Sequence, residues 1–290
     1  MRDINGKTRT CGLIGNPVEH TLSPIIHNTL ADELGINMAY VPFHVETGQL
    51  EYAAKGAYAL NILGCNVTVP YKSDIVPQLV EIDDLAAKIG SVNTLVRVEG
   101  GYKGYNTDMT GLLRAMKSDD VIIEGEEIIV LGAGGVGRAV AYMCAAYGAA
   151  RVYLLNRTLD KAISVANEVN HNTGRDCVEA RALSDYKTLA GKKYVVLQCT
   201  SIGLYPKVED VVIEDESFYD MVKVGYDLIY TPWETKFMTM VKAGGAKAYN
   251  GLKMLLYQGV DAFELWNDCK VSDESAYKVY ELMKEAVTSR

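Results

Sequence analysis

The sequence predicts a two-domain α/β protein, and three observations support this fold class. The chain has 290 residues, which is enough for two domains of ordinary size. Its composition, 49% hydrophobic and 23% charged, is typical of a globular protein with a buried core. Short apolar segments alternate with segments of helical periodicity along the whole chain, a pattern typical of parallel sheets covered by helices.

The first half of the chain contains four predicted strands and four predicted helices. The strands are short apolar runs, near 10–15, 38–44, 63–69 and 92–98. The helices show apolar residues at spacings of three and four, near 24–34, 48–58, 73–89 and 108–117. An acidic loop, Ser118–Glu127, follows, so we expect a domain boundary near 108–125.

The second half begins with the most apolar window of the chain, Ile128–Ala150. This window is long enough to cross a bilayer, but it contains Arg138 and several glycines, and it predicts a buried strand, turn and helix instead. A strand and helix series continues to about Lys247. The last stretch, Gly251–Arg290, has helical periodicity.

Charge and composition exclude several classes of function. The net charge is −8, with no basic stripe, which argues against binding to nucleic acid or an anionic membrane. The N-terminus has no apolar signal segment, and the six cysteines form no C-x-x-C pair, so reduced thiols in a cytoplasmic protein are expected. The four histidines show no metal-ligand spacing, and no metal site is predicted.

A glycine-rich turn follows the strand that begins at Ile128, in the stretch "IIVLGAGGVGRA". Gly132, Gly134 and Gly137 have the G-x-G-x-x-G spacing of a dinucleotide-binding turn. The first glycine allows the tight turn, the second lets a pyrophosphate approach the backbone, and the third allows close packing of helix on strand. A purely structural turn is the alternative. The context predicts a Rossmann-type doubly wound domain, with Gly132, Ala133, Gly134, Gly135 and Val136 near the cofactor.

The end of the next predicted strand favours NADP over NAD. NAD-binding domains usually carry an acidic residue there, whereas this chain has Asn156, Arg157 and Thr158, with Lys161 three residues on. Arg157 is suited to pair with a 2′-phosphate and stack on adenine. The alternative is that Thr158 caps a helix while Arg157 and Lys161 are solvated.

A lone lysine follows the third predicted strand, in "NVTVPYK" (66–72). Val67 and Val69 alternate with polar residues, and Pro70 cannot donate to a sheet, so the strand must end there. Lys72 therefore lies just past a strand end, where α/β proteins place their ligands. Taken alone, such a lysine is usually only a solvated charge.

Seven stretches in one order resemble the shikimate dehydrogenase family, over about Gly12 to Trp266. They are "GNPVEHTLSPIIHN", "NVTVPYK", "SVNT", "NTD", "GAGGVGRA", "NRT" and "GLKMLLYQ". The resemblance implies NADP-dependent, reversible reduction of 3-dehydroshikimate to shikimate, in the pathway to chorismate and the aromatic amino acids. It also implies a substrate-binding domain of residues 1–107, completed by helices in 251–290, and a cofactor domain of residues 108–250.

The resemblance identifies Lys72 and Asp108 as the catalytic pair. Hydride transfer to a ketone builds negative charge on oxygen, so a proton donor must lie close by, and a carboxylate would orient the lysine. Because Asp108 also begins a predicted helix, a capping role is the alternative, and the two roles are compatible.

The resemblance also implies the remaining substrate contacts. Thr21 and Ser23 would bind the carboxylate, although Ser23 before Pro24 is also a good helix start. The residues expected near the ring hydroxyls are Thr68, Asn93 and Gln258, and Tyr230 is expected on the substrate side. Each has a structural alternative, as a strand residue, a turn former or a helix-surface amide. The family usually has serine at position 21, so Thr21 leaves the choice between shikimate and quinate open.

Further cofactor contacts implied by the resemblance are Thr200, Leu228, Gly251 and Asp84, although an exposed helix acid is the favoured interpretation of Asp84.

A non-catalytic ligand sensor with the same pocket is an alternative of a different class, which the intact Lys72 and Asp108 disfavour. The sequence leaves monomer and homodimer open.

Overall fold

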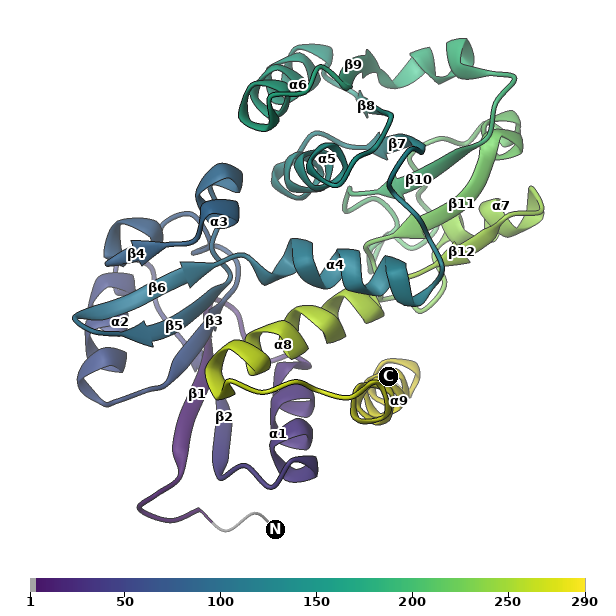
Figure 1. The fold of residues 1–290 in the computed structure, drawn as a ribbon. Helices are drawn as coiled ribbons and strands as arrows, with labels where there is room; N and C mark the ends of the chain where they lie inside the picture. The colour runs from purple at the N-terminus through teal and green to yellow at the C-terminus, as the bar shows by residue number, and fades with distance from the viewer. Residues whose placement is uncertain (1–3, 290) are drawn as a thin grey trace. The chain divides into compact units, whose positions relative to one another are not determined.

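The computed structural model describes residues 4–289, which fall into two compact units (Figure 1). The first unit contains the chain up to Arg114 together with Lys253–Ala286, and the second is built from Ala115–Leu252. The sequence predicts these divisions after residues 107 and 250. The helix α4 (Thr107–Ser118) runs through the first division, and α8 (Leu252–Asn267) begins at the second.

The sheet of the first unit is mixed. Its strands follow the order β2-β1-β3-β5-β6-β4, with β1 parallel to β2 and β3, and β5 antiparallel to β3 and β6. The strands are β1 (Arg9–Gly15), β2 (Met38–His44), β3 (Gly64–Val67), β4 (Glu81–Ile82), β5 (Thr94–Val98) and β6 (Gly101–Tyr105). The strand β5 departs from the parallel pairing that the sequence pattern favours, and the turn at Gly100 (φ +80°) joins β5 and β6 as a hairpin.

The helices of the first unit match most of the sequence predictions. The predictions at 24–34, 48–58 and 108–117 are confirmed, and the C-terminal stretch is helical as expected. The helices are α1 (Ser23–Glu33), α2 (Leu50–Ala59), η1 (Val76–Gln78), α3 (Asp84–Ile89), α4, α8 and α9 (Asp273–Thr288).

The predicted helix at 73–89 is wrong. The segment holds the short η1, the two-residue strand β4 and then α3. Pro77 lacks an N–H and limits the first turn. Asp83 then starts a new helix, because its Oδ2 accepts a hydrogen bond from Leu85 N at 3.0 Å. The segment has a helix-like spacing of apolar residues because both of its ends are buried, at Ile75 and Ile89, although the backbone between them is not one helix.

The sheet of the second unit is parallel throughout and doubly wound. Its order is β12-β11-β10-β7-β8-β9, so the chain starts in the middle at β7 and reverses direction between β7 and β10. This confirms the Rossmann-type prediction. The strands are β7 (Glu127–Leu131), β8 (Arg151–Asn156), β9 (Val178–Ala182), β10 (Tyr194–Gln198), β11 (Val222–Asp227) and β12 (Lys247–Tyr249).

Both faces of this second sheet are buried. Ile129 and Leu131 pack with Tyr153, Phe218 and Phe237 in one apolar cluster. Since side chains alternate along a strand, Ile128 and Val130 face the opposite side, and they are also fully buried. The elements that cover the sheet are α5 (Gly135–Ala146), α6 (Leu159–Thr173), η2 (Leu183–Leu189), η3 (Glu216–Met221) and α7 (Lys236–Ala243).

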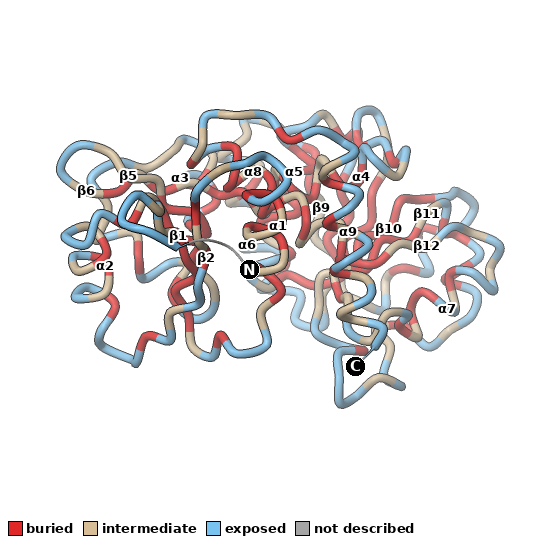
Figure 2. The backbone as a smooth tube through the Cα atoms, turned by 90° about the horizontal axis from the view of Figure 1, so that it is seen from below, coloured by how far each residue is buried: buried red, intermediate tan, exposed pale blue. Residues whose placement is uncertain are grey.

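Buried residues follow the strands of the two sheets, whereas the connecting loops are mostly exposed (Figure 2). The apolar window Ile128–Ala150 is accordingly β7, the glycine turn and α5, as predicted. Between residues 4 and 289, we find no helix with the length and hydropathy needed to cross a membrane.

The helices α4 and α8 lie side by side (Figure 1), and their backbones come close together at Gly111. A methyl group at Gly111 would lie 2.7 Å from Gln258 Cα, well inside van der Waals contact. Gly56 on α2 is different, because a methyl group there would meet nothing within 4 Å. The two helical glycines therefore differ in packing while sharing the same backbone flexibility.

Replacing Gly111 with alanine is expected to destabilise the chain by about 1–3 kcal/mol, because α4 and α8 would have to separate. Gly56→Ala is the matched control and is expected to stabilise it by about 0.5–1 kcal/mol, since it only removes backbone entropy from the unfolded chain. Urea unfolding of the two variants measures both effects. Equal changes in the two variants would show that the close helix contact is not what Gly111 provides.

Candidate functional site

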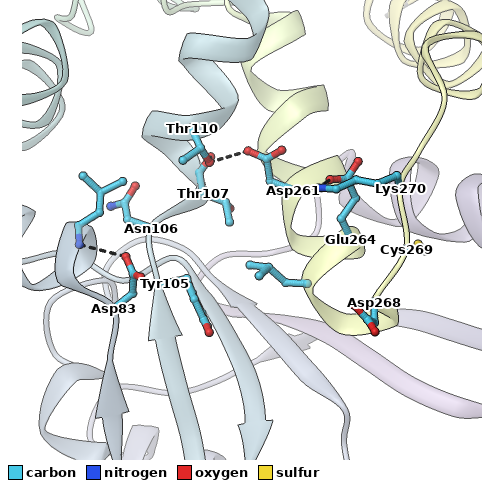
Figure 3. Close-up of a pocket in the computed structure, with 12 residues that line it drawn as sticks. Asp83, Tyr105, Asn106, Thr107, Thr110, Asp261, Glu264, Asp268, Cys269 and Lys270 are labelled. Atoms are coloured by element: carbon cyan, nitrogen blue, oxygen red, sulfur yellow. Dashed lines mark hydrogen bonds and ion pairs between the residues drawn. The ribbon is translucent and has the colours of Figure 1, made fainter. Parts of the chain in front are cut away.

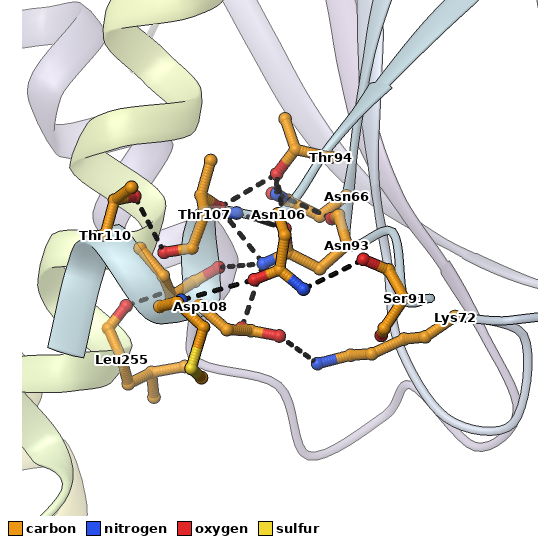
Figure 4. A network of polar contacts seen from close by, with 12 residues as sticks. Asn66, Lys72, Ser91, Asn93, Thr94, Asn106, Thr107, Asp108, Thr110 and Leu255 are labelled. Carbon is orange, nitrogen blue, oxygen red and sulfur yellow. Dashed lines mark hydrogen bonds and ion pairs between the residues drawn. The ribbon is translucent and has the colours of Figure 1, made fainter. Parts of the chain in front are cut away.

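An ion pair joins Lys72 and Asp108 in the first unit (Figure 4). Lys72 lies in the turn that follows β3, and Asp108 lies in the first turn of α4. Lys72 Nζ is 2.6 Å from Asp108 Oδ2, and the two side chains are 32% and 17% exposed. The ammonium group is therefore held by a carboxylate while part of it still faces solvent.

Asn93, just before β5, holds the other oxygen of this carboxylate. Asn93 Nδ2 donates to Asp108 Oδ1 at 2.9 Å, and Asn93 Oδ1 accepts from the backbone N–H of Thr107 at 2.7 Å. Gln258 on α8 lies beside the same amide, with Oε1 3.4 Å from Asn93 Nδ2. Gln258 is buried, so it is not the helix-surface amide of the structural alternative. Four predicted substrate residues thus form one connected group.

Sequence reasoning missed the residues that support this group. Asn106 caps α4, because its Oδ1 accepts from Met109 N at 3.2 Å. The alternative role of Asp108 as the cap is therefore wrong. Asn66 and Thr94 are buried behind Asn93 and hydrogen-bonded to each other. The signal was present, since Asn66 opens "NVTVPYK" and Asn106 opens "NTD", but a single asparagine does not reveal which partner it meets.

Thr21 and Ser23 lie together at the start of α1. Thr21 Oγ1 donates to Ser23 Oγ at 3.1 Å and accepts from Ser23 N at 3.2 Å. Ser23 is the first helical residue and makes no side-chain cap, so its predicted capping role is wrong, whereas Pro24 does lie in the first turn. Thr68 follows β3, where its backbone N–H donates to Ile14 O at 2.9 Å.

The glycine turn of the second unit is closely constrained. Gly132 has a φ of +102°, a conformation that side chains rarely adopt, and a methyl group there would lie 2.6 Å from Thr200 Cγ2. A methyl group at Gly137 would overlap Gly132 O. Gly134 is open, with nothing within 4 Å of such a group. The turn therefore packs tightly on one side and leaves the backbone of Gly134 free on the other.

Asn156 links this turn to the end of β8. Asn156 Oδ1 accepts from Ala133 N at 3.1 Å, and its Nδ2 donates to Thr158 O at 2.9 Å. Thr158 precedes α6 but makes no side-chain cap, so the alternative role of its hydroxyl is wrong. Arg157 and Lys161 are exposed beside it. The two cations thus follow closely in the chain after Asn156, the residue that contacts the glycine turn.

The ends of β10 and β11 complete this edge of the sheet. Gln198 Oε1 accepts from Thr200 N at 2.6 Å, and Gln198 Nε2 donates to Asp227 Oδ1 at 3.3 Å. Asp227 is the last residue of β11 and precedes Leu228. A methyl group at Gly251 would lie 2.6 Å from the carbonyl carbon of Leu228, so these two backbones are in contact. Sequence reasoning missed Gln198 and Asp227, which resemble ordinary strand residues.

Two predicted residues belong to a different unit from their companions. Asp84 is exposed at the start of α3 in the first unit, whereas the other predicted cofactor residues belong to the second unit. Tyr230 belongs to the second unit, whereas the other predicted substrate residues belong to the first.

A separate cavity of about 460 Å³ lies in the first unit, where Asn106 and Thr107 of the α4 start form part of its lining (Figure 3). Two of its carboxylates are engaged by neighbours: Asp261 accepts from Thr110 at 2.5 Å, and Glu264 from Lys270 at 2.7 Å. None of the sequence-predicted site residues lines it. Over residues 4–289, no group of histidine, cysteine, aspartate and glutamate side chains is arranged to hold a metal ion.

Comparison with known proteins identifies the family. Residues 13–95 match the shikimate dehydrogenase substrate binding domain, 114–221 match shikimate/quinate 5-dehydrogenase, and 251–288 match the shikimate 5′-dehydrogenase C-terminal domain. Shikimate dehydrogenase (NADP⁺) of Desulforamulus reducens is 41% identical to this chain, over 91% of each protein. The chain belongs to the shikimate dehydrogenase family.

Solved structures of this family have the same fold. A crystal structure of a shikimate dehydrogenase in complex with NADP⁺ covers 97% of each chain, with a TM-score of 0.88 and 36% identity. Quinate dehydrogenase from Corynebacterium glutamicum in complex with NAD covers 96% of this chain and 99% of its own, with a TM-score of 0.86 but 26% identity. The similarity is thus higher to the NADP-bound shikimate dehydrogenase than to the quinate enzyme.

Replacing Asp227 with asparagine is expected to change how stability depends on pH. Burial raises the pKa of Asp227 to about 6, against hydrogen bonds from Thr235 and Ile229 N. An unfolded aspartate has a pKa of about 3.9. The folded chain therefore binds this proton more tightly, which stabilises it below about pH 4, and this contribution is lost as the pH rises to about 6.

The unfolding free energy of the unmodified chain, relative to Asp227→Asn, should fall by about 2–3 kcal/mol between pH 4 and pH 7. Urea denaturation of both proteins at each pH gives this difference, and other titrating groups cancel in it. A difference that stays constant, or rises with pH, would contradict the account of Asp227.

Proposed function

We propose that this chain is an NADP-dependent shikimate dehydrogenase, which reduces 3-dehydroshikimate reversibly to shikimate in the pathway to chorismate and the aromatic amino acids. The observation that carries the proposal is the contact of Lys72 with Asp108 at 2.6 Å, in a chain that belongs to this family. Charge that develops on a carbonyl oxygen needs a proton donor, and an oriented ammonium group supplies one.

In this proposal Lys72 is the catalytic acid and base. Its ammonium group gives a proton to the oxygen of the reduced ketone, and its amine accepts that proton in the direction of oxidation. Asp108 orients the lysine, since its Oδ2 holds Nζ while Oδ1 is held by Asn93. The carboxylate therefore has little freedom to turn away from Lys72.

The remaining polar groups of the first unit would bind the substrate. The paired hydroxyls of Thr21 and Ser23, at the start of α1, are suited to a carboxylate. Thr68, Asn93 and Gln258 would hydrogen-bond the ring hydroxyls, and Tyr230 is proposed as a further substrate contact. We assign the substrate-binding role to residues 1–107 with 251–290, and the cofactor-binding role to 108–250.

The second unit fits NADP. When bound, NADPH supplies the hydride. The open backbone of Gly134 at the start of α5 suits a pyrophosphate, because unpaired N–H groups at a helix start bind anions. Arg157 and Lys161 would pair with the 2′-phosphate. Thr200, Leu228 and Gly251 would line the rest of the site, with Asp84 as a further contact from the first unit.

Quinate is the second candidate substrate. The methyl group of Thr21 would lie beside C1, where shikimate and quinate differ, and the fold is shared with a quinate dehydrogenase. Initial rates with shikimate and quinate, each with NADP⁺ and NAD⁺, decide between the two.

We further propose that the enzyme works in the cytoplasm, without nucleic acid or membrane partners. It would be a monomer or a homodimer, and sedimentation would distinguish these two states.

Lys72→Ala is expected to lower kcat for shikimate oxidation by about 10²–10⁴-fold, because the general base is lost. Binding of shikimate, measured by titration calorimetry, should change much less. The matched control is Lys55→Ala, which removes a lysine from a surface pair with Glu51 at 2.6 Å in the same unit and should leave kcat unchanged. Near-normal turnover of Lys72→Ala would remove Lys72 from the mechanism.

Arg157→Ala is expected to lower kcat/KM for NADP⁺ by about 10–100-fold, the value of a charge-assisted phosphate contact. The value for NAD⁺ should stay within about twofold, since NAD⁺ lacks that phosphate. Arg151→Ala, at the opposite end of the same strand, serves as the control. Equal losses with the two cofactors would show that Arg157 does not read the 2′-phosphate.

A further inference from the structure

A chain of buried polar side chains lies behind the ion pair of the site. His27 on α1 and Tyr40 on β2 both reach Asn66 on β3, and Asn66 in turn reaches Thr94 at the start of β5. None of the four is more than 4% exposed. Since a buried polar group without a partner is costly, each of these side chains must have a defined role as donor or acceptor.

The backbone of Asn93 fixes the direction of the Asn66 amide. Asn66 Nδ2 lies 3.3 Å from Asn93 O and 3.0 Å from Thr94 Oγ1. Turning the amide over would bring two carbonyl oxygens together with no proton between them. Asn66 Oδ1 therefore points the other way, toward the Tyr40 hydroxyl at 2.8 Å and His27 Nε2 at 3.1 Å.

This direction assigns the proton of His27. An amide oxygen only accepts, so His27 must carry its proton on Nε2 to bond with Asn66. Its Nδ1 is then unprotonated, and this atom has no hydrogen-bond partner among residues 4–289. Burial lowers the pKa of His27 to about 3, against the hydrogen bond to Asn66, so the imidazole stays neutral near neutral pH.

Thr94 and Asn93 continue this order of hydrogen-bond donors and acceptors from Asn66 to Asp108 (Figure 4). Thr94 Oγ1 accepts from Asn66, so its own proton goes to Asn93 Oδ1 at 3.2 Å or to Thr107 Oγ1 at 2.9 Å. Asn93 Oδ1 also accepts from Thr107 N, which leaves Asn93 Nδ2 facing Asp108. The order of donors and acceptors is thus continuous from His27 to the carboxylate.

We propose that His27 is a positioning residue for Asp108: the proton on its Nε2 holds the oxygen of the Asn66 amide, whose nitrogen is held by the Asn93 carbonyl, and Asn66, through Thr94 and Asn93, keeps the carboxylate in place. The inference rests on the proposed function, because it assigns His27 to that reaction. His27 is fully buried, so it acts through Asn66 and not on the substrate.

Simple packing of the ring predicts a different outcome. His27 stacks on Tyr40, with ring centroids 4.1 Å apart, and lies 5.0 Å from the Trp266 ring. If packing were its whole role, His27→Phe would be tolerated and His27→Gln would be damaging. Positioning reverses this order, because glutamine can place an N–H near the position of Nε2 and phenylalanine cannot.

The kinetic test compares the two variants in the full chain. His27→Phe is expected to lower kcat for shikimate oxidation about tenfold, with binding of NADP⁺ unchanged, because one hydrogen bond of the relay is lost. His27→Gln should retain kcat within about threefold, and His171→Phe, an exposed histidine on α6, is the control. Unchanged kcat in the phenylalanine variant, or an equal loss in both, would overturn the proposal.

A second measurement does not depend on activity or on any variant. Nitrogen-15 NMR of the unmodified chain reports which nitrogen of His27 carries the proton, and we expect the Nε2–H form. Observation of the Nδ1–H form would overturn the relay. If the unmodified chain failed to oxidise shikimate, the proposed function would be contradicted, while the NMR result would still decide the direction of the buried chain.

Discussion

The position of one carboxylate constrains the rest of the first unit. Asp108 has both oxygens occupied, one by Lys72 and the other by Asn93, and Asn93 is itself held by the backbone of α4. This arrangement requires that the end of β3 and the beginnings of β5 and α4 lie close to one another. The mixed sheet provides this, since the antiparallel pairing of β3 with β5 places Asn66 opposite Thr94. Hydrogen bonds in such a network hold each of these side chains in one orientation.

The second unit depends on a different constraint, which is the backbone of the glycine turn. The positive φ of Gly132 and the contact of Gly137 with Gly132 O fix how α5 leaves β7. Side chains then reinforce the turn from both sides, Asn156 from β8 and Thr200 from β10, and Gln198 with the buried Asp227 supports Thr200. The edge that suits an anionic cofactor is therefore held mainly by backbone and by the amides of Asn156 and Gln198, and its cations lie at the surface.

The sequence predicted the features that depend on local pattern. Short apolar runs marked β1, β2 and the strands of the second sheet, and glycine spacing marked the turn after β7. The direction of strand pairing in the first sheet was not predictable, because β6 contains glycines and gives a weak strand signal. The helix predicted for residues 73–89 was wrong for another reason, since the short elements in this segment have apolar residues at a helix-like spacing. Asn66, Asn106 and Asp227 were missed for a related reason: a polar residue next to a strand shows its role only when the fold brings its partner to it.

The central claim is that Lys72 and Asp108 act as one unit, and a double-mutant cycle tests it most directly. The measurement is kcat for shikimate oxidation in Lys72→Ala, Asp108→Ala and the double variant, each compared with the unmodified chain. If the carboxylate works through the lysine, the double variant should be no slower than Lys72→Ala, since Asp108 has nothing left to orient. Losses that multiply, so that the double variant is slower by the product of the single effects, would show two independent contributions and contradict the account.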